Sequence, residues 1–210
     1  MNYLTFEKVG GASLILGSLL LAAYSALFPA LLPVSNGTND YVLMVMNPNW
    51  VRLAIIAFAG VILMLIGFYA VYQRIRSSAG LVGAIGFLFI EAAYLLQACK
   101  VTWELFLYPI IAAQPESAFL LRDLIIKHDP AVGIFRLMAS ITILVGIVLF
   151  CYTLYRSCEY PKSAAVLIFV GALVYALGPM ISIFVSVVGI FTLAVGCLLI
   201  GLRLFRVQRA

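Results

Sequence analysis

Charged residues are scarce in this chain of 210 residues: Asp, Glu, Lys and Arg make up 10% of it, against 65% hydrophobic residues. A soluble domain typically contains about 25% charged and about 45–50% apolar residues. A globule of this size cannot bury such an excess, because its surface must be largely polar. The composition therefore excludes a soluble enzyme, a disordered chain and a disulfide-rich secreted module, and indicates a polytopic membrane protein.

Residues that carry catalysis or bind metals are also few. His128 is the single histidine, which excludes a haem with two histidine ligands. The chain contains no HExxH motif, no Ser/His/Asp set and no Walker motif. Its four cysteines form no CxxC pair and have no metal-binding spacing. We therefore expect no cofactor, no metal and no nucleic-acid partner, and we favour a protein that is not an enzyme.

Long apolar runs fill most of the sequence. A helix needs about 20 apolar residues to cross the hydrocarbon core. Six stretches meet this requirement: Val9–Leu32, Val51–Tyr72, Leu81–Ile111, Val132–Leu154, Pro161–Leu177 and Ile181–Leu204. Only Gly178-Pro179 interrupts the last two, so we expect a tight turn there. The prediction is one all-α domain over residues 1–210, with six transmembrane helices arranged as three sequential hairpins.

The distribution of basic residues predicts the orientation, because short cytoplasmic loops are enriched in Lys and Arg. Eight basic residues fall on one side of the six-span arrangement: Lys8, Arg74, Arg76, Arg156, Lys162, Arg203, Arg206 and Arg209. Three fall on the other side: Arg52, Arg122 and Lys127. We therefore expect both termini in the cytoplasm. The net charge of +5 is then largely a property of the inner face, which suits contact with anionic membrane lipids.

The hairpins share a pattern that indicates an internal repeat. The first and third helices end in Leu27-Phe28-Pro29 and Leu107-Tyr108-Pro109. Each is followed by a polar loop that closes with Asn47-Pro48 or Asp129-Pro130. Two interpretations remain open: a parallel hairpin repeat over residues 9–76 and 81–156 with an abbreviated third hairpin at 161–206, or local preferences at helix ends that coincide.

The second of these hairpins carries a polar stripe in its first helix. Gln97, Lys100, Glu104 and Tyr108 lie on one face at helical spacing. Arg52 and Arg136 enter the membrane from the same side. We therefore predict a polar layer near the outer surface that binds a ligand through these side chains: Trp50, Arg52, Gln97, Lys100, Trp103, Glu104, Tyr108 and Arg136. The competing interpretation is that the charges extend to the interface and pair with one another.

Glu91 lies on a different face of the same helix, near the middle of the membrane. Its neighbours on that face are mostly apolar, so an unpaired carboxylate there would be protonated. Two roles remain open. Glu91 either carries a proton or binds a cation, or it is a structural acid that forms a hydrogen bond with Ser, Thr or Tyr on a neighbouring helix.

The hairpin endings, together with Tyr155-Arg156, Tyr160-Pro161-Lys162, Gly171 and Gly178-Pro179, resemble a broad group of small bacterial six-helix integral membrane proteins of unknown function. The resemblance covers nearly the whole chain. It implies a multi-pass protein of the bacterial inner (plasma) membrane and implies no activity.

Three functional hypotheses follow from these features. The leading one is a non-enzymatic membrane protein that binds a lipid, another amphipathic small molecule or a partner protein through its outer polar layer. The second is a small proton-coupled transporter that uses Glu91 and the Lys100/Glu104 stripe. The third is an accessory subunit of a larger membrane complex. The expected partners are membrane lipids, an amphipathic ligand, and a second copy of the chain or a larger complex.

Overall fold

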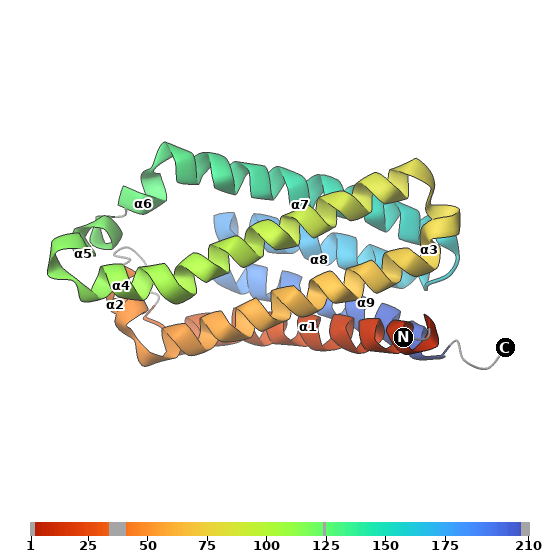
Figure 1. Ribbon diagram of the computed structural model, residues 1–210, viewed down its shortest axis with the longest axis horizontal. Coiled ribbons are helices and arrows are strands. Elements are labelled where there is room, and N and C mark those ends of the chain that lie inside the picture. The colour runs from red at the N-terminus through yellow and green to blue at the C-terminus, as the bar shows by residue number, and fades with distance from the viewer. Residues whose placement is uncertain (1–2, 34–40, 124, 207–210) are drawn as a thin grey trace.

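The computed structural model describes residues 3–33, 41–123 and 125–206, and the secondary structure of this part of the chain is entirely helical. The helices in chain order are α1 (Tyr3–Leu31), α2 (Tyr41–Met46), α3 (Pro48–Thr102), the π-helical turn η1 (Trp103–Leu107), α4 (Tyr108–Ala113), α5 (Pro115–Arg122), α6 (Ile125–His128), α7 (Pro130–Ser157), α8 (Lys162–Ile181) and α9 (Ile183–Arg206). Figure 1 shows the long helices running along the long axis of the molecule. The predicted all-α class is confirmed.

Helix α3 consists of two arms that meet at Gly80. This residue has φ 57° and ψ −164°, a backbone conformation that only glycine adopts readily. The chain therefore reverses there, and residues 48–79 lie beside residues 81–102 (Figure 1). The Tyr72 and Phe87 rings stack across the two arms with their centroids 4.2 Å apart. The sequence prediction of separate second and third helices thus corresponds to the two arms of α3.

The two Asx-Pro pairs found in the sequence start helices. The Asn47 side chain accepts a hydrogen bond from the Asn49 N–H, and Pro48 is the first residue of α3. Asp129 accepts hydrogen bonds from the N–H groups of Ala131 and Val132 at the start of α7. Both arrangements satisfy N–H groups that have no partner within the helix, and proline fits the first helical position because its missing N–H is not needed there.

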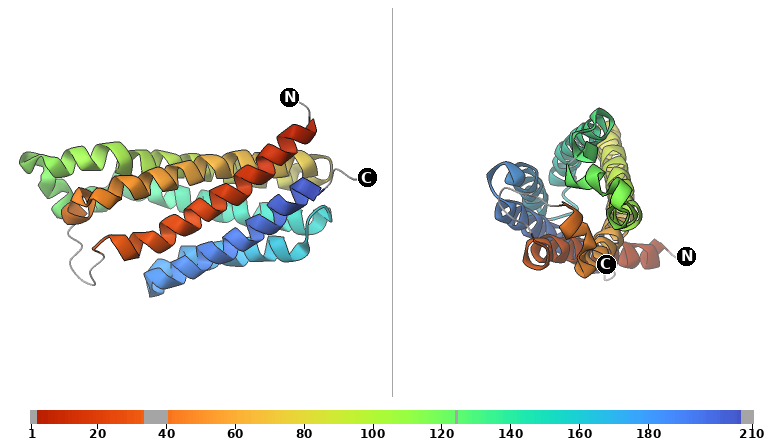
Figure 2. Two further views of the ribbon diagram at one scale, coloured as in Figure 1. Left: turned by 90° about the horizontal axis from the view of Figure 1, so that it is seen from below. Right: turned by 90° about the vertical axis from the view of Figure 1, so that its left-hand side faces the viewer.

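The long helices pack as a bundle in which α1 contacts α3 on one side and α9 on the other. Helix α9 packs along α8, and the second arm of α3 packs along α7 (Figure 2). The contact between α7 and α8 is much less extensive. The main core contains Phe68, Phe150, Leu154 and Ile200, all 2% exposed or less.

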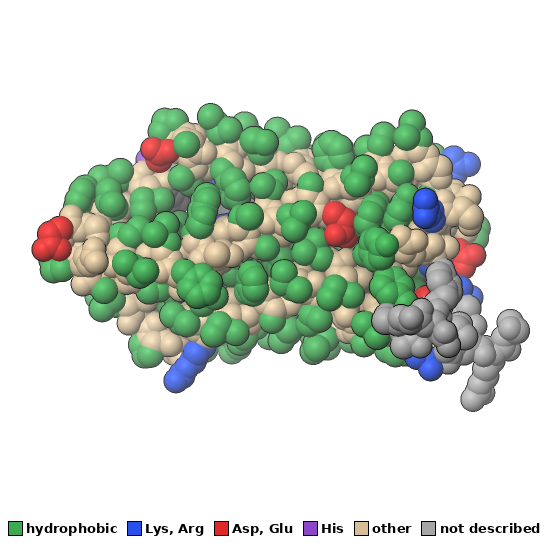
Figure 3. Space-filling model, viewed as in Figure 1, with side chains coloured by type: hydrophobic (Ala, Val, Ile, Leu, Met, Phe, Trp, Pro, Cys, Tyr) green, Lys and Arg blue, Asp and Glu red, His purple; other side chains and the backbone are tan. Residues whose placement is uncertain are grey.

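Four helices in the described residues are long and apolar enough to cross a membrane: Phe6–Leu31, Pro48–Ala113, Pro130–Ser157 and Ile183–Phe205. The second of these includes both arms of α3, and the apolar part of α8, Lys162–Gly178, is shorter. Figure 3 shows hydrophobic side chains covering most of the visible face, with charged side chains mainly toward the two ends. These features are those of a membrane protein.

The predicted turn at Gly178-Pro179 is wrong. Helix α8 continues to Ile181, and the chain turns at Ser182, which has φ −166° and ψ 147°. Proline is tolerated in this last turn because another donor replaces its missing N–H: the Ser186 hydroxyl of α9 lies 3.4 Å from the Tyr175 carbonyl oxygen, four residues before Pro179. Gly178 lets Ser186 approach this closely, since a Cβ atom at position 178 would collide with it.

The first turns of α1 and the last turns of α9 lie at the same end of the bundle (Figure 1), which we call the termini end. An ion network connects three segments there. The Arg74 guanidinium of α3 contacts Glu7 of α1 at 3.2 Å and Glu159, in the loop between α7 and α8, at 3.2 Å. The Glu7 side chain is 7% exposed and that of Arg74 is 13% exposed, so the pair is largely shielded from solvent. Sequence analysis did not predict this network, because Arg74 is 67 residues from Glu7 and 85 residues from Glu159 along the chain.

Candidate functional site

An ion pair within the second arm of α3 and η1 forms the centre of the candidate site. The Lys100 Nζ atom lies 3.2 Å from Glu104 Oε1, one helical turn away. Glu104 therefore pairs with a neighbouring cation, as the interpretation in which these charges pair with one another expects. The two partners differ in accessibility: the Glu104 side chain is 9% exposed and the Lys100 side chain 45%. Glu104 is thus fixed inside the protein, whereas Lys100 retains surface for another partner.

Glu104 lies in a π-helical turn, and the backbone hydrogen bonds around it explain why this turn forms. In this turn the N–H of Tyr108 bonds the carbonyl oxygen of Trp103, five residues earlier. The corresponding donor for the Glu104 carbonyl would be residue 109, which is proline and has no N–H. The indole Nε1 of Trp50 supplies the missing hydrogen bond, donating to the Glu104 carbonyl oxygen at 2.7 Å. Single π turns inside α-helices occur frequently at functional sites.

Aromatic side chains from four helices surround this turn. Trp50 contacts Phe28 of α1 and Tyr41 of α2, with ring centroids 6.2 and 5.9 Å apart. Tyr41 also contacts Tyr108 of α4, with centroids 6.2 Å apart. A cavity of about 10 Å³ lies between Glu104 and the α1 aromatic residues, including Tyr24. This space is sufficient for about one water molecule.

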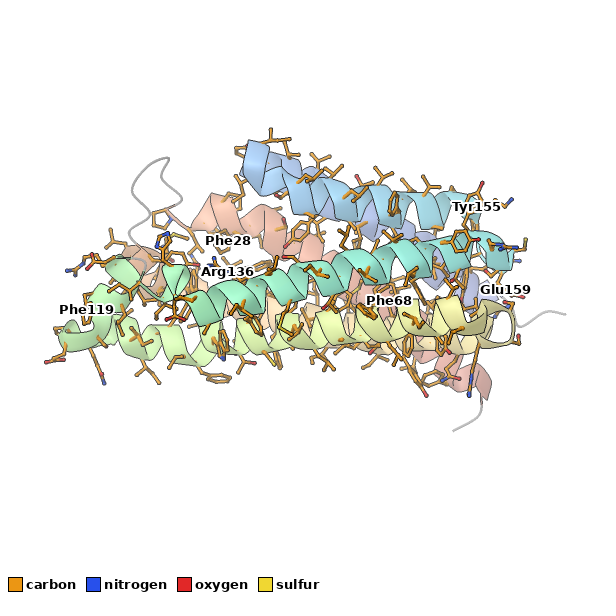
Figure 4. All side chains as sticks on the ribbon, turned by 90° about the horizontal axis from the view of Figure 1, so that it is seen from above. Phe28, Phe68, Phe119, Arg136, Tyr155 and Glu159 are labelled. Atoms are coloured by element: carbon orange, nitrogen blue, oxygen red, sulfur yellow. The ribbon has the colours of Figure 1, made fainter. Side chains whose placement is uncertain are left out.

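Further polar groups approach the ion pair from α1, α7 and α8. Lys100 lies within electrostatic reach of Tyr24 of α1 and Tyr175 of α8. Arg136 of α7 lies within electrostatic reach of Tyr41 and Tyr108. Figure 4 shows Arg136 extending from α7 toward the part of the bundle where Phe28 lies. We define the polar cluster as these residues: Tyr24, Tyr41, Lys100, Glu104, Tyr108, Arg136 and Tyr175.

The polar cluster offers hydroxyl groups beside its charges. Burial raises the pKa of Tyr41 to about 12, and the nearby Glu104 carboxylate raises it as well. The Tyr41 hydroxyl is therefore neutral at physiological pH and able to donate a hydrogen bond. With two cations and one carboxylate, the cluster has an excess of positive charge. It suits a ligand with an anionic group and hydrogen-bond acceptors.

The structure brings together some of the predicted site residues and separates others. Trp50, Lys100, Glu104, Tyr108 and Arg136 meet around the π turn. Arg52 does not join them: it is exposed, and its guanidinium contacts Asn49 of its own helix at 3.4 Å.

Two other predicted residues lie on the same helical segment as the ion pair. Trp103 packs on Phe135 of α7, with ring centroids 5.0 Å apart, and so helps to join η1 to α7. Gln97 lies one turn before Lys100 and is partly buried.

Three tyrosines of the polar cluster, Tyr24, Tyr41 and Tyr175, were missed by sequence analysis. They come from α1, α2 and α8, and none of these helices contains a charged residue or another typical binding residue near its tyrosine. One signal was present in the sequence: Tyr24 precedes Phe28 by one helical turn, and both rings contact each other at 5.6 Å.

Glu91 lies apart from the polar cluster on the second arm of α3. Its Oε1 atom is buried and has no hydrogen-bond partner. The nearby hydroxyl of Thr102 donates instead to the Ala98 carbonyl oxygen at 2.8 Å. The hydrogen bond expected for a purely structural acid is therefore not found among the described residues.

Within the described ranges, no group of three or more His, Cys, Asp and Glu residues is placed to hold a metal ion. The four cysteines are free thiols. The possible hairpin repeat over residues 9–76 and 81–156 stays a prediction, and Arg52 and Arg136, one in each hairpin, have different surroundings. The triplet Asn36-Gly37-Thr38, which has the form of an N-glycosylation sequon, lies outside the described residues.

Comparison of the chain with protein-family models, with curated proteins and with solved structures found no match.

Proposed function

We propose that this protein is a non-enzymatic integral membrane protein that binds an anionic amphipathic molecule, such as a lipid, through the polar cluster. One observation carries the proposal: Lys100 is held by the buried Glu104 yet keeps 45% of its side-chain surface accessible. An ion pair that served only to neutralise two buried charges would shield both partners. Here the carboxylate positions the cation, and the cation remains available.

The surroundings of Lys100 fit both the anionic headgroup and the apolar chain of such a ligand. Arg136 adds a second positive charge, and the tyrosine hydroxyls add hydrogen-bond donors for a phosphate or carboxylate group. The adjacent half of α7 presents exposed apolar side chains, including Ile134, Leu137 and Ile141. These provide a surface along which an acyl chain can lie while the headgroup reaches the cluster.

The proposal includes a topology. Six segments cross the membrane: α1, the two arms of α3, α7, α8 and α9, with both termini on the cytoplasmic side of a bacterial plasma membrane. The bias of Lys and Arg toward the termini end supports this orientation. The polar cluster then lies toward the outer leaflet, since it is at the opposite end of the bundle.

Native mass spectrometry of the purified protein in detergent tests the binding. We expect an anionic lipid such as phosphatidylglycerol to bind about tenfold more tightly than phosphatidylcholine with the same acyl chains. Arg136→Gln is expected to weaken this preference severalfold. Because Lys100→Gln leaves Glu104 buried without its partner, the double variant Lys100→Met/Glu104→Gln is the better test of the ion pair.

Arg52→Gln is the matched control, since Arg52 is an exposed cation on the same side of the bundle that does not contact the cluster. It should bind both lipids as the unaltered chain does. Equal binding of the two lipids by the unaltered chain would contradict the proposal. An equal loss in the Arg52 and Arg136 variants would show that only the general charge of this end matters.

A second candidate function, proton-coupled transport, is favoured by the buried Glu91 oxygen that has no hydrogen-bond partner. An acid without a structural partner near the middle of the membrane is a group that proton carriers use. Reconstituted vesicles with an imposed pH gradient test it. Uptake of an anionic amphiphile that depends on the gradient and is lost in Glu91→Gln would favour transport over binding.

A further inference from the structure

A second binding site is indicated at the termini end, far from the polar cluster. A cavity of about 410 Å³ opens there between the loop that joins α7 to α8 and the last turns of α9. Its volume falls within the range of about 300–1,000 Å³ that is usual for small-molecule sites. Residues 158–161 form one wall, and Leu199, Leu202 and Arg203 form the other. Figure 4 shows Glu159 in the loop just beyond the end of α7.

The cavity contains one charge of each sign. Arg203 is exposed, and within the described part of the chain it takes part in no ion pair. Glu159 is 44% exposed and contacts Arg74. Arg74 also contacts the buried Glu7, so two carboxylates share one guanidinium. The network keeps a net negative charge, and Glu159 is its accessible member.

Two further features of the cavity indicate the chemistry of the rest of its ligand. Leu199 and Leu202 give the cavity an apolar wall on α9, and Leu202 is 39% exposed toward the surroundings of the bundle. Pro161, on the opposite wall, is the N-cap of α8 and provides no side-chain hydrogen bond. The partial positive charge of the α8 N-terminus therefore adds to that of Arg203 at the edge of the cavity.

We propose that this cavity binds the headgroup of a zwitterionic phospholipid with a primary ammonium group, that is, a phosphatidylethanolamine. The phosphate pairs with Arg203, the ammonium group donates hydrogen bonds to Glu159, and the glycerol and first acyl carbons lie on Leu199 and Leu202. A choline headgroup carries the same charges but has no N–H to donate, and a glycerol headgroup has no cation for Glu159. The site therefore selects the headgroup by its ammonium protons.

The test is a titration of the delipidated full chain in non-ionic detergent, followed by native mass spectrometry. The lipids are phosphatidylethanolamine, phosphatidylcholine and phosphatidylglycerol with identical acyl chains. We expect Arg203→Gln to weaken phosphatidylethanolamine binding about tenfold, because the phosphate loses its charged partner. Glu159→Gln is expected to remove the preference for phosphatidylethanolamine over phosphatidylcholine, while Arg74 keeps its contact with Glu7. Arg122→Gln alters an exposed cation at the other end. It should change neither the affinity for phosphatidylethanolamine nor the preference over phosphatidylcholine.

A second measurement locates the bound lipid. Cys158 is exposed on the cavity wall, so a polar maleimide should modify it more slowly when phosphatidylethanolamine is bound. Cys158→Ala is the control for this labelling, because Cys99, the other exposed cysteine, lies in a membrane-spanning segment next to Lys100. Protection of Cys158 that is lost in Arg203→Gln would confirm the site even if lipid also binds the polar cluster.

Several results would overturn the proposal. One is equal binding of the ethanolamine and choline lipids by the unaltered chain. Another is an Arg203→Gln variant that binds and protects Cys158 as before. Displacement of the lipid by free phosphoethanolamine at equal concentration would show that the cavity binds a soluble compound and not a lipid.

Discussion

At the scale of single residues, Glu104 is held through both its side chain and its backbone. Its carboxylate pairs with Lys100 and its carbonyl accepts a hydrogen bond from Trp50. Glu91, thirteen residues earlier on the same arm, has a buried oxygen with no partner. Two acids on one helical segment therefore differ in their surroundings: Glu104 is paired with a cation, and the buried Glu91 oxygen has no hydrogen-bond partner among the described residues.

Replacement of Glu91 measures how its unpaired buried oxygen affects the free energy of unfolding. Glu91→Leu removes a buried oxygen without leaving a partner unsatisfied, so we expect the free energy of unfolding to stay unchanged or to rise by about 1 kcal/mol. Glu104→Leu is the contrasting variant, because it leaves Lys100 without its carboxylate, and it should be clearly destabilising. Unfolding in mixed detergent micelles measures both. A loss of about 1–3 kcal/mol in Glu91→Leu would show instead that Glu91 has a structural partner.

At the scale of the elements, two local departures from regular helix shape the site. The π turn at η1 places Glu104 beside Trp50, and the bend at Gly80 brings the two arms of α3 together. Neither departure arises from flexibility. Pro109 withholds one N–H, and Gly80 has a positive φ that other residues adopt only with strain.

The π turn predicts that the effect of replacing Trp50 depends on whether residue 109 is proline. Trp50→Phe keeps an aromatic ring but leaves the buried Glu104 carbonyl without a donor, so we expect a loss of about 1–3 kcal/mol in unfolding free energy. Pro109→Ala restores a backbone N–H to this turn. In that background Trp50→Phe should cost clearly less. Equal losses in the two backgrounds would show that the indole contributes through packing alone.

Gly80→Ala tests the bend. The structure has no atom within 4 Å of a Cβ built at position 80, so any effect comes from the backbone and not from a collision. We expect a loss of about 1–3 kcal/mol, because alanine is strained at this φ and ψ. Gly133→Ala is the matched control: its Cβ also meets open space, but the residue is helical in α7. There the substitution should be neutral or stabilising by up to about 1 kcal/mol.

At the scale of the whole molecule, the two ends of the bundle differ. At the termini end, the network of Arg74 with two glutamates shares Glu159 with the cavity of about 410 Å³ between residues 158–161 and the last turns of α9. The opposite end contains the polar cluster, with the exposed half of α7 beside it. Helix α7 contacts α8 much less extensively than it contacts α3.

Reporter fusions test the proposed topology. Fusions after Arg76 and after Arg156 should report the cytoplasm, because both positions lie near the termini end. Fusions near Asn36 and Ser117 should report the outside. A reporter after Arg76 that reads outside would contradict the six-span arrangement, since both arms of α3 would then have to be placed differently.

The sequence by itself determined the membrane class, the all-helical fold and the helix starts at Asn47 and Asp129, and it placed Lys100 and Glu104 one helical turn apart. All of these follow from local rules: apolar run length, capping at an Asx-Pro pair, and the four-residue spacing of a helical turn. The misplaced turn at Gly178-Pro179 shows the limit of such rules. Proline usually indicates a helix end, but here Ser186 of the next helix satisfies the carbonyl that proline leaves open.

Only the tertiary structure decided which distant side chains meet. Tyr24, Tyr41 and Tyr175 join the polar cluster because the fold brings them within electrostatic reach of Lys100, while Arg52 turns away toward Asn49. Glu7, Arg74 and Glu159 likewise meet across three segments. In a chain of uniformly apolar helices, hydrophobic periodicity does not specify which helices are neighbours. The pairing comes from close approaches at small residues and from a few polar contacts, which only the folded chain reveals.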